Sequence, residues 1–189
     1  MYLFFDTETT GLPKSWKAPV TDLNNWPRLV QLAFLFYDKS GNRIVEGNHI
    51  IKPEGFTIPV EVSRIHGITT ERANQEGRPL LAVLQEFQSL IDQSEFLVAH
   101  NMSFDEKIVG AEFLRNRMQD STATKRKICT MQSTTNFCAL EGPYGYKWPK
   151  LSELHIRLFG KSFEEAHNAA VDIQATAKCF WKLRELKVI

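Results

Sequence analysis

Residues 4–13 read FFDTETTGLP, which sets two acids directly behind an apolar run. Residues 2–5 predict a short buried strand, and the strand propensity falls at Asp6. Side chains alternate between the two faces of an extended chain, so Asp6 and Glu8 project to the same side, about 7 Å apart along the strand. Two carboxylates sharing a partly buried site would repel by roughly 4 kcal/mol at a separation of about 4 Å. A metal ion, an arginine or protonation of one acid has to offset that repulsion.

Two further segments carry an acid near the start of a predicted helix. In AHNMSFDEK, Asp105 falls in the first turn of a helix that follows a short apolar strand, at the end of the strand where α/β sheets place their ligands. In EAHNAAVDIQAT, His167 precedes the final helix and Asp172 follows five residues later. A first-turn acid by itself is explained as well by the helix dipole. The histidine and aspartate together, among small residues, favour a functional site.

The combined charge of these acids indicates what they hold. Asp6, Glu8, Asp105 and Asp172 would bring four negative charges together, more than one histidine or arginine could balance. Two divalent cations would balance them, and carboxylate oxygens without thiolates select hard ions such as Mg²⁺ or Mn²⁺. Two such ions about 3.5–4 Å apart suit in-line displacement at phosphorus. The pattern predicts phosphodiester hydrolysis, with His167 suited to take the proton from the attacking water at neutral pH.

Three motifs in order, FDTETTG, HNMSFD and HNAAVD, resemble those of the DEDD exonuclease superfamily. The likeness is to its histidine branch (DEDDh), which contains the proofreading epsilon subunit of bacterial DNA polymerase III, and it extends from Leu3 to about Leu183. It implies a ribonuclease H-like fold and 3′–5′ removal of nucleoside 5′-monophosphates from a nucleic-acid end. It also implies two Mg²⁺ or Mn²⁺ ions and a general base, carried by Asp6, Glu8, Asp105 and Asp172 as ligands and His167 as base.

The same resemblance implies contacts to the terminal nucleotide. The segment after the first acids would contact it through backbone and hydroxyl groups, and IHGIT at 65–69 is similar to a family segment that sits against the terminal base or sugar. The asparagine of HNMSFD is a further candidate. The residues implied are Thr7, Thr9, Thr10, Gly11, Ile65, His66 and Asn101.

The predicted elements that position these residues form an α/β fold. Residues 28–38 and 43–53 flank KSGN and predict an antiparallel hairpin after the first strand. A helix at 79–93, a strand at 95–99 and a helix at 103–118 follow, then a short strand around Ile128. Further helices are expected at 130–138, 151–159 and 168–186. We expect a mixed five-stranded sheet, an antiparallel meander plus parallel strands, flanked by helices.

Composition predicts a single cytoplasmic domain over residues 1–189. The chain of 21.7 kDa is 43% hydrophobic and 24% charged, which is ordinary for a globular protein. No window resembles a membrane span, and the N-terminus lacks the basic and apolar regions of a signal sequence. Cys129, Cys138 and Cys179 form no C-x-x-C pair, which disfavours a disulfide framework or a zinc knuckle.

The loop at 13–29, PKSWKAPVTDLNNWPRL, leaves two readings of its tryptophans open. Trp16 and Trp26 either stack on bases of an incoming strand or pin the loop to the core. For Trp148, in a later Gly/Pro-rich loop, we expect packing. A net charge of +1 by itself indicates no particular partner.

The preferred substrate is the 3′ end of single-stranded DNA, and two rivals stay open. A ribonuclease of the same superfamily would use the same chemistry. A catalytically silent interaction domain is disfavoured, because all candidate catalytic positions hold competent residues. Association with a polymerase is a further option, but no tethering tail is visible before the chain ends at Ile189, so a free-standing enzyme is expected.

Overall fold

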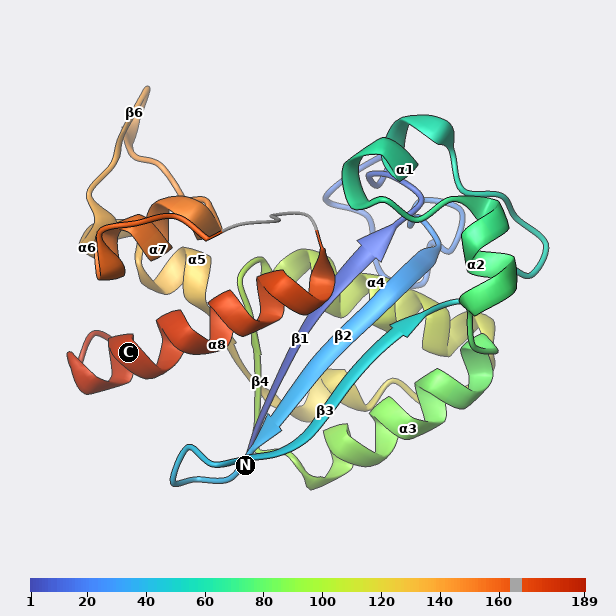
Figure 1. Ribbon diagram of the computed structural model, residues 1–189, viewed down its shortest axis with the longest axis horizontal. Helices are drawn as coiled ribbons and strands as arrows, with labels where there is room; N and C mark the ends of the chain where they lie inside the picture. The colour runs from blue at the N-terminus through green and yellow to red at the C-terminus, as the bar shows by residue number, and fades with distance from the viewer. Residues whose placement is uncertain (164–167) are drawn as a thin grey trace.

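The computed structural model describes residues 1–163 and 168–189, so that His167 lies outside the described residues. Five strands form one mixed sheet of order β3-β2-β1-β4-β5. The first three strands make an antiparallel meander, and β4 and β5 extend the sheet in parallel from the other edge of β1 (Figure 1). The predicted mixed sheet is therefore confirmed. The strands are β1 Tyr2–Thr9, β2 Leu29–Tyr37, β3 Arg43–Ile50, β4 Phe96–Ala99 and β5 Arg126–Cys129.

Helices cover both faces of the sheet, and a small hairpin projects beside them (Figure 1). Among the described residues, no helix has the length and apolar character needed to cross a membrane. The helices are α1 Val60–His66, α2 Thr70–Glu76, α3 Leu80–Gln93, α4 Met102–Arg115, the 3₁₀ turn η1 Ser121–Thr124, α5 Thr130–Ser133, α6 Thr135–Cys138, α7 Leu151–Phe159 and α8 Ala169–Glu185, and the hairpin is β6 Glu141–Gly142 with β7 Gly145–Tyr146.

Three local features differ from the sequence prediction. Helices α1 and α2 were not predicted, because each has only seven residues and shows no helical repeat. Gly67, at φ 74°, ends α1, and the Thr69 side chain accepts a hydrogen bond from the N–H of Arg72 to begin α2. The single helix predicted at 130–138 is divided into α5 and α6 at Thr134, whose hydroxyl donates to the carbonyl of Thr130 at 2.6 Å.

Strand β1 is longer than its apolar run. The expectation that the strand weakens at Asp6 is wrong, since β1 continues to Thr9 and pairs with β2 along its whole length, including Asp6 with Ala33 and Glu8 with Gln31. The backbone partner supplies the hydrogen bonds whatever the side chains prefer. On the other edge, pairing with β4 ends where Phe4 meets Val98. The last residues of β1 therefore have a sheet partner on one side only.

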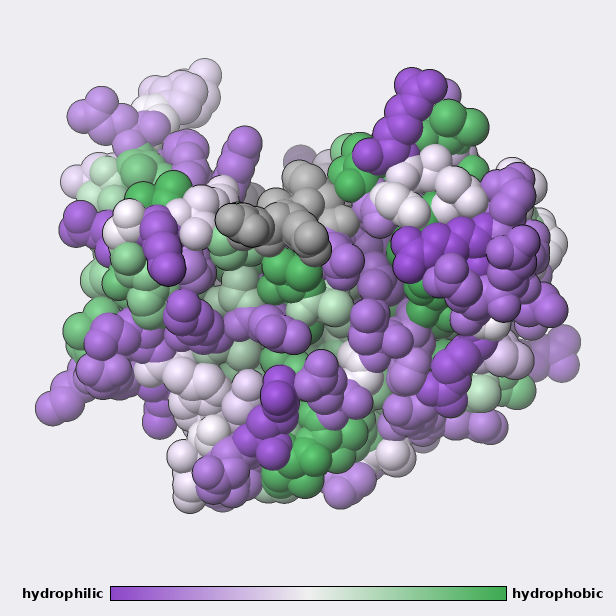
Figure 2. Space-filling view, in the orientation of Figure 1, coloured by the Kyte–Doolittle hydropathy of each residue, from purple (hydrophilic) through white to green (hydrophobic). Residues whose placement is uncertain are grey.

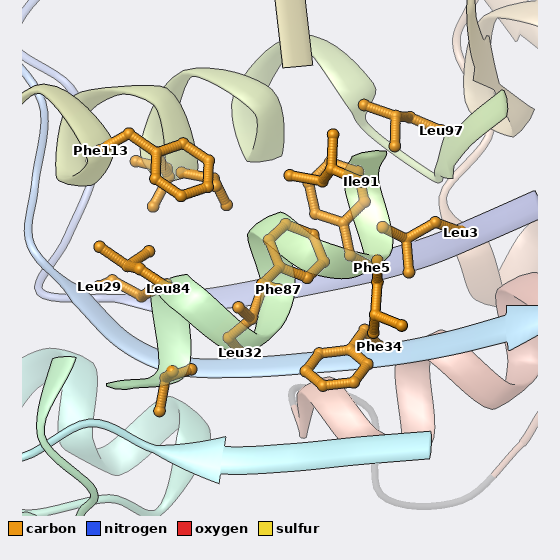
Figure 3. Packing of buried hydrophobic residues seen from close by; sticks show 14 of the residues in the cluster. Leu3, Phe5, Leu29, Leu32, Phe34, Leu84, Phe87, Ile91, Leu97 and Phe113 are labelled. Carbon is orange, nitrogen blue, oxygen red and sulfur yellow. The ribbon is translucent and has the colours of Figure 1, made fainter. Parts of the chain in front are cut away.

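The alternation of side chains along β1 separates two cores. Leu3 and Phe5 pack against α3, where Phe87 and Ile91 meet them (Figure 3). Phe4 packs on the opposite face, against Phe180 of α8. Asp6 and Glu8 continue the alternation of Phe4, so they belong to the face that α8 covers.

The loop at 13–29 is fixed from inside. Trp26 is 3% exposed, and its indole N–H donates to the carbonyl of Pro19 at 2.9 Å. Arg115 of α4 donates to the carbonyls of Leu23 and Trp26, each at 2.6 Å. Of the two readings for this loop, pinning holds for Trp26, whereas Trp16 is 52% exposed.

A buried ion cluster joins this loop to α4. Glu112 is completely buried, and its Oε1 accepts from the Arg28 Nε at 2.8 Å and from the backbone N–H of Leu29 at 3.1 Å. Arg115 pairs with the same oxygen at 3.0 Å. The start of β2, beside the end of β1, is thereby held against α4.

Candidate active site

Three carboxylates meet where α8 crosses β1. The first turn of α8 begins at Asn168, whose side chain accepts from the N–H of Ala170 at 3.1 Å, and this turn carries Asp172. One carboxylate oxygen each from Asp6, Glu8 and Asp172 lie within 4.8 Å of one another. The i, i+2 spacing in a strand and a first-turn acid in a helix thus bring the three side chains to one point.

Asp105 does not belong to this group of three, but it approaches Asp6 from α4, on the edge of β1 that β4 leaves unpaired. Its Oδ1 accepts from the backbone N–H of Thr7 at 3.1 Å and from the Thr7 hydroxyl at 2.7 Å. Since β4 pairs with β1 only as far as Phe4, Asp105 supplies the acceptor for an N–H beyond the end of the pairing. The fourth acid found in the sequence is thereby fixed at 3% exposure beside Asp6.

The pKa values of these acids reflect their burial and their mutual repulsion. Burial raises the pKa of Asp6 well above its usual value, and the charges of Asp105, Asp172 and Glu8 add to the effect. Burial, followed by the charges of Asp172 and Asp105, raises the pKa of Glu8 to about 8. Burial also raises the pKa of Asp105 to about 7, although the two hydrogen bonds from Thr7 act to lower it. Without a cation, the cluster binds protons near neutral pH.

The residues present fit a divalent cation. Within residues 1–163 and 168–189, no lysine or arginine forms an ion pair with Asp6, Glu8 or Asp105. Of the three ways to offset the repulsion, the arginine is therefore not used for these acids, and protons and metal ions compete for the oxygens. An all-carboxylate donor set with raised pKa values is the kind that Mg²⁺ and Mn²⁺ occupy.

A cavity of about 490 Å³ opens from Asp6 and Asp172. Lys150 brings a positive charge to its wall, and Asn101, one of the predicted substrate contacts, also lines it. The other lining residues were not predicted as site residues from the sequence. For His100, its position directly after the apolar strand predicted at 95–99 could have indicated such a role. The remaining lining residues are His100, Leu151, Ser152 and Phe163.

His100 supports the cavity and is not suited to proton transfer. Its Nε2 lies 3.0 Å from the carbonyl of Pro149, which can only accept, so Nε2 carries the proton and Nδ1 accepts from the Thr130 hydroxyl at 3.0 Å. Burial lowers the pKa of His100 to about 4, which keeps the ring neutral. The histidine thus fastens the segment before α7 to the end of β4.

A second cavity, of about 310 Å³, lies beside the first on the α1 side. It gathers most of the residues that the sequence resemblance assigned to the terminal nucleotide. The lining residues are Thr7, Glu8, Thr9, Gly11, Leu12, Val62, Ile65, His66 and Phe104.

The predicted contact residues differ in how free their polar groups are. The Thr7 hydroxyl already donates a hydrogen bond to Asp105. Thr10 does not line the cavity, and its hydroxyl accepts a hydrogen bond from the N–H of Arg28 at 2.9 Å. Ile65 is 57% exposed on the cavity wall. His66 is buried, which lowers its pKa, and its Nδ1 accepts from the N–H of Ile68 at 3.1 Å. Gly11, at φ 146°, adopts a backbone conformation that other residues rarely take.

The mixed sheet and the acids gathered at the end of its central strand define a nuclease of the ribonuclease H-like class. The RNase_T family model, described as "Exonuclease", matches residues 3–180. The chain belongs to this exonuclease family.

Curated relatives include longer polymerases. The chain is 31% identical over 177 residues to the PolC-type DNA polymerase III of Streptococcus thermophilus, covering 94% of this chain and 11% of that protein. It is 33% identical over 187 residues to the PolC-type enzyme of Streptococcus mutans, covering 98% and 11%. The chain thus corresponds to about a tenth of each polymerase.

Solved structures confirm the ribonuclease H-like fold. Escherichia coli exonuclease I in complex with a dA16 oligonucleotide aligns with a TM-score of 0.76 at 20% identity, over 99% of this chain and 41% of that one. The zinc-ion-bound form of the complex of E. coli exonuclease I with single-stranded DNA aligns with a TM-score of 0.75 at 22% identity, over 98% and 40%. Exonuclease I from Methylocaldum szegediense gives 0.73 at 21% identity, over 97% and 40%.

Proposed function

We propose that this protein is a 3′–5′ exonuclease that hydrolyses phosphodiester bonds at the 3′ end of single-stranded DNA and releases nucleoside 5′-monophosphates. The observation that carries the proposal is the cluster of Asp6, Glu8 and Asp172, with oxygens within 4.8 Å of one another, and Asp105 beside it. Membership of the exonuclease family supports the reaction. The polymerase relatives and the oligonucleotide bound to exonuclease I support DNA as the substrate.

Asp6, Glu8, Asp105 and Asp172 would hold two divalent cations, Mg²⁺ or Mn²⁺. Such ions, when bound, activate the attacking water and stabilise the leaving oxygen. The raised pKa values support this assignment, because carboxylates that repel one another gain most from a shared cation. Thr7 acts as a positioning residue, since its two hydrogen bonds hold Asp105 against β1.

The cavity beside α1 is the proposed binding place of the terminal nucleotide. Its wall offers Ile65 and Leu12, both exposed, to the sugar and base, and Gly11 lets the backbone approach. Asn101 lines the adjoining cavity, where Lys150 is available to a phosphate. Location in the cytoplasm, as a free-standing single domain over residues 1–189, is part of the same proposal, and association with a polymerase is the alternative.

The general base remains a prediction from the sequence. His167 lies outside the described residues and directly precedes Asn168, the N-cap of the helix that carries Asp172. An alanine at position 167 is expected to lower kcat by about 10²- to 10⁴-fold and to leave the stabilisation by metal ions in place. A loss of metal-dependent stabilisation in this variant would instead make His167 a ligand.

The test of the proposal is degradation of end-labelled oligonucleotides. Single- and double-stranded DNA and RNA, labelled at the 5′ or the 3′ end, are incubated with Mg²⁺, Mn²⁺ or excess chelator. We expect a 3′-labelled DNA strand to release labelled mononucleotide at once and a 5′-labelled strand to shorten stepwise, with no reaction in chelator.

Variants at the cluster complete the test. Asp6→Asn should abolish turnover, whereas Glu46→Gln, on exposed β3, should retain it. Full activity of Asp6→Asn, or of the wild type in chelator, contradicts the proposed site. Preferential cleavage of RNA would identify an exoribonuclease, and cleavage of neither polymer would identify a silent binding domain.

A further inference from the structure

Two tryptophans from distant parts of the chain are exposed around one cavity. Trp16, in the loop after β1, is 52% exposed, and Trp148, between β7 and α7, is 60% exposed, contrary to the packing predicted for it. The cavity between them has a volume of about 400 Å³, within the range of small-molecule sites. Its lining, named here the Trp16–Trp148 cavity, consists of Trp16, Asn101, Ser103, Lys107, Met131 and Trp148.

This cavity is continuous with the candidate active site. Asn101 lines both it and the cavity that opens from Asp6 and Asp172. On the other side, the ring of Trp16 lies 5.7 Å from that of Phe104, which lines the cavity beside α1. The hairpin of β6 and β7 and helix α1 stand at the end of the molecule to which β1 points, and the surface is indented between them (Figures 1 and 2).

The backbones that carry both indoles are fixed, although the rings are exposed. The carbonyl of Trp16 accepts from the Lys107 Nζ at 3.2 Å. The residue after Trp148 is Pro149, which is buried and whose carbonyl accepts from His100 at 3.0 Å. Aromatic rings exposed on a fixed backbone lose little conformational entropy when a ligand stacks on them.

The charge around the cavity favours an anion. Among the described residues, the lining contains Lys107 and no acid, and Lys150 lines the adjoining cavity together with the proposed metal ligands Asp6 and Asp172. A ligand that combines flat aromatic groups with negative charges meets both features, and a nucleic-acid strand does so at every nucleotide.

We infer that the Trp16–Trp148 cavity binds a nucleobase upstream of the terminal nucleotide, by stacking on the exposed indoles, with Lys107 near a phosphate of the strand. This inference rests on the proposed function, since it extends the substrate away from the carboxylates. Stacking on an indole tolerates every base, which suits an enzyme that degrades a strand of any sequence.

The test compares a substrate that reaches the cavity with one that does not. A single-stranded dT12 spans it, whereas the p-nitrophenyl ester of thymidine 5′-monophosphate has one nucleotide and ends at the carboxylates. For Trp16→Ala and Trp148→Ala we expect the KM for dT12 to rise about 5- to 100-fold, with kcat within about twofold. The change with the ester should be much smaller. Trp16→Phe and Trp148→Phe should recover most of the KM, because a phenyl ring still stacks.

Tyr144→Ala is the matched control, since this tyrosine at the hairpin tip is fully exposed and does not line the cavity. It should match the wild type with both substrates. Melting temperatures of all variants show whether a raised KM reflects a damaged fold, and the phenylalanine variants keep the test valid if an alanine variant is unstable.

A binding measurement separates failure of this inference from failure of the proposed function. Quenching of tryptophan fluorescence by dT12 in the presence of Ca²⁺ measures affinity without turnover, and each Trp→Ala variant should bind about 5- to 100-fold more weakly. If the wild type cleaves neither substrate, the proposed function fails, and the quenching titration still decides whether the cavity binds the strand. If both variants bind and cleave dT12 within about twofold of wild type, or lose dT12 and the ester equally, the upstream subsite is wrong.

Discussion

In the absence of divalent cations, the stability of the folded protein is expected to fall as the pH rises from about 5 to about 8.5. A carboxyl group whose pKa is higher in the folded than in the unfolded state binds its proton more tightly when folded. Its contribution to stability is fully present below the unfolded pKa and is lost as the pH rises through the folded pKa. Here that window extends from about 4.5 to about 8 for Glu8, and Asp105 changes in the same direction with a folded pKa of about 7.

The size of the effect follows from the pKa of Glu8. Each tenfold change in proton affinity corresponds to about 1.4 kcal/mol, so the rise from 4.5 to about 8 gives an upper limit of about 5 kcal/mol. Glu8 is only partly buried and salt screens its neighbours, so we take about half of this value, roughly 2 kcal/mol. In a chain of 189 residues, 1 kcal/mol changes Tm by about 2–4 °C, so roughly 2 kcal/mol predicts a fall of about 4–8 °C.

The assay is thermal unfolding across this pH range in chelator and in Mg²⁺ or Mn²⁺. In chelator, Tm should fall toward high pH, and added metal should restore it most at high pH, where protons no longer compete for the oxygens. Glu8→Gln should flatten the pH dependence in chelator and weaken the effect of metal. Glu46→Gln, on the exposed strand β3, should leave both unchanged. A Tm in chelator that is constant or rises between about pH 5 and 8 would refute the repulsion that underlies the site.

Two further predictions concern residues whose hydrogen bonds and ion pairs support the site. Thr7→Val keeps the shape of the side chain but removes the 2.7 Å hydrogen bond to Asp105. We expect kcat to fall about tenfold or more, while Tm changes by only a few degrees. An unchanged kcat would show that the hydroxyl does not position the acid. Glu112→Gln removes the buried negative charge with which Arg28 and Arg115 both pair. Urea unfolding should show that the free energy of unfolding falls by about 3 kcal/mol. A fall below about 1 kcal/mol would mean that water solvates the two arginines as well as Glu112 does.

The proximity of the acids was predictable because the geometry of strands and helices fixes which side chains share a face. Alternation along a strand puts Asp6 and Glu8 on one face whatever surrounds them, and that face is the one that α8 covers. First-turn positions in helices likewise bring Asp105 and Asp172 to the ends of those helices, beside β1. What the sequence could not supply was the use of each polar group, such as the Thr7 hydroxyl, which is committed to an acid 98 residues away.

The tryptophans show the same limit more sharply. Trp16 and Trp26 occupy one loop and have the same side chain, yet one is exposed and the other buried. The two side chains have different partners, which the sequence pattern of the loop does not predict. The Trp26 indole N–H donates to the carbonyl of Pro19, and the Trp16 ring lies beside that of Phe104. Burial thus settles packing for Trp26, whereas stacking of the exposed Trp16 on a base stays a proposal.

The short length of β4 is itself a condition for the site. Pairing of β4 with β1 ends at Phe4, and α4 begins soon afterwards, so that the Asp105 carboxylate can accept from the amide of Thr7. One more paired residue in β4 would move the start of α4 by about 3.3 Å along β1, which exceeds the tolerance of a hydrogen bond. It would also bring a backbone carbonyl toward the amide that Asp105 now uses. An unpaired strand edge usually favours pairing with another chain. Here the unpaired edge of β1 lets the Asp105 carboxylate of α4 approach Asp6 and Glu8.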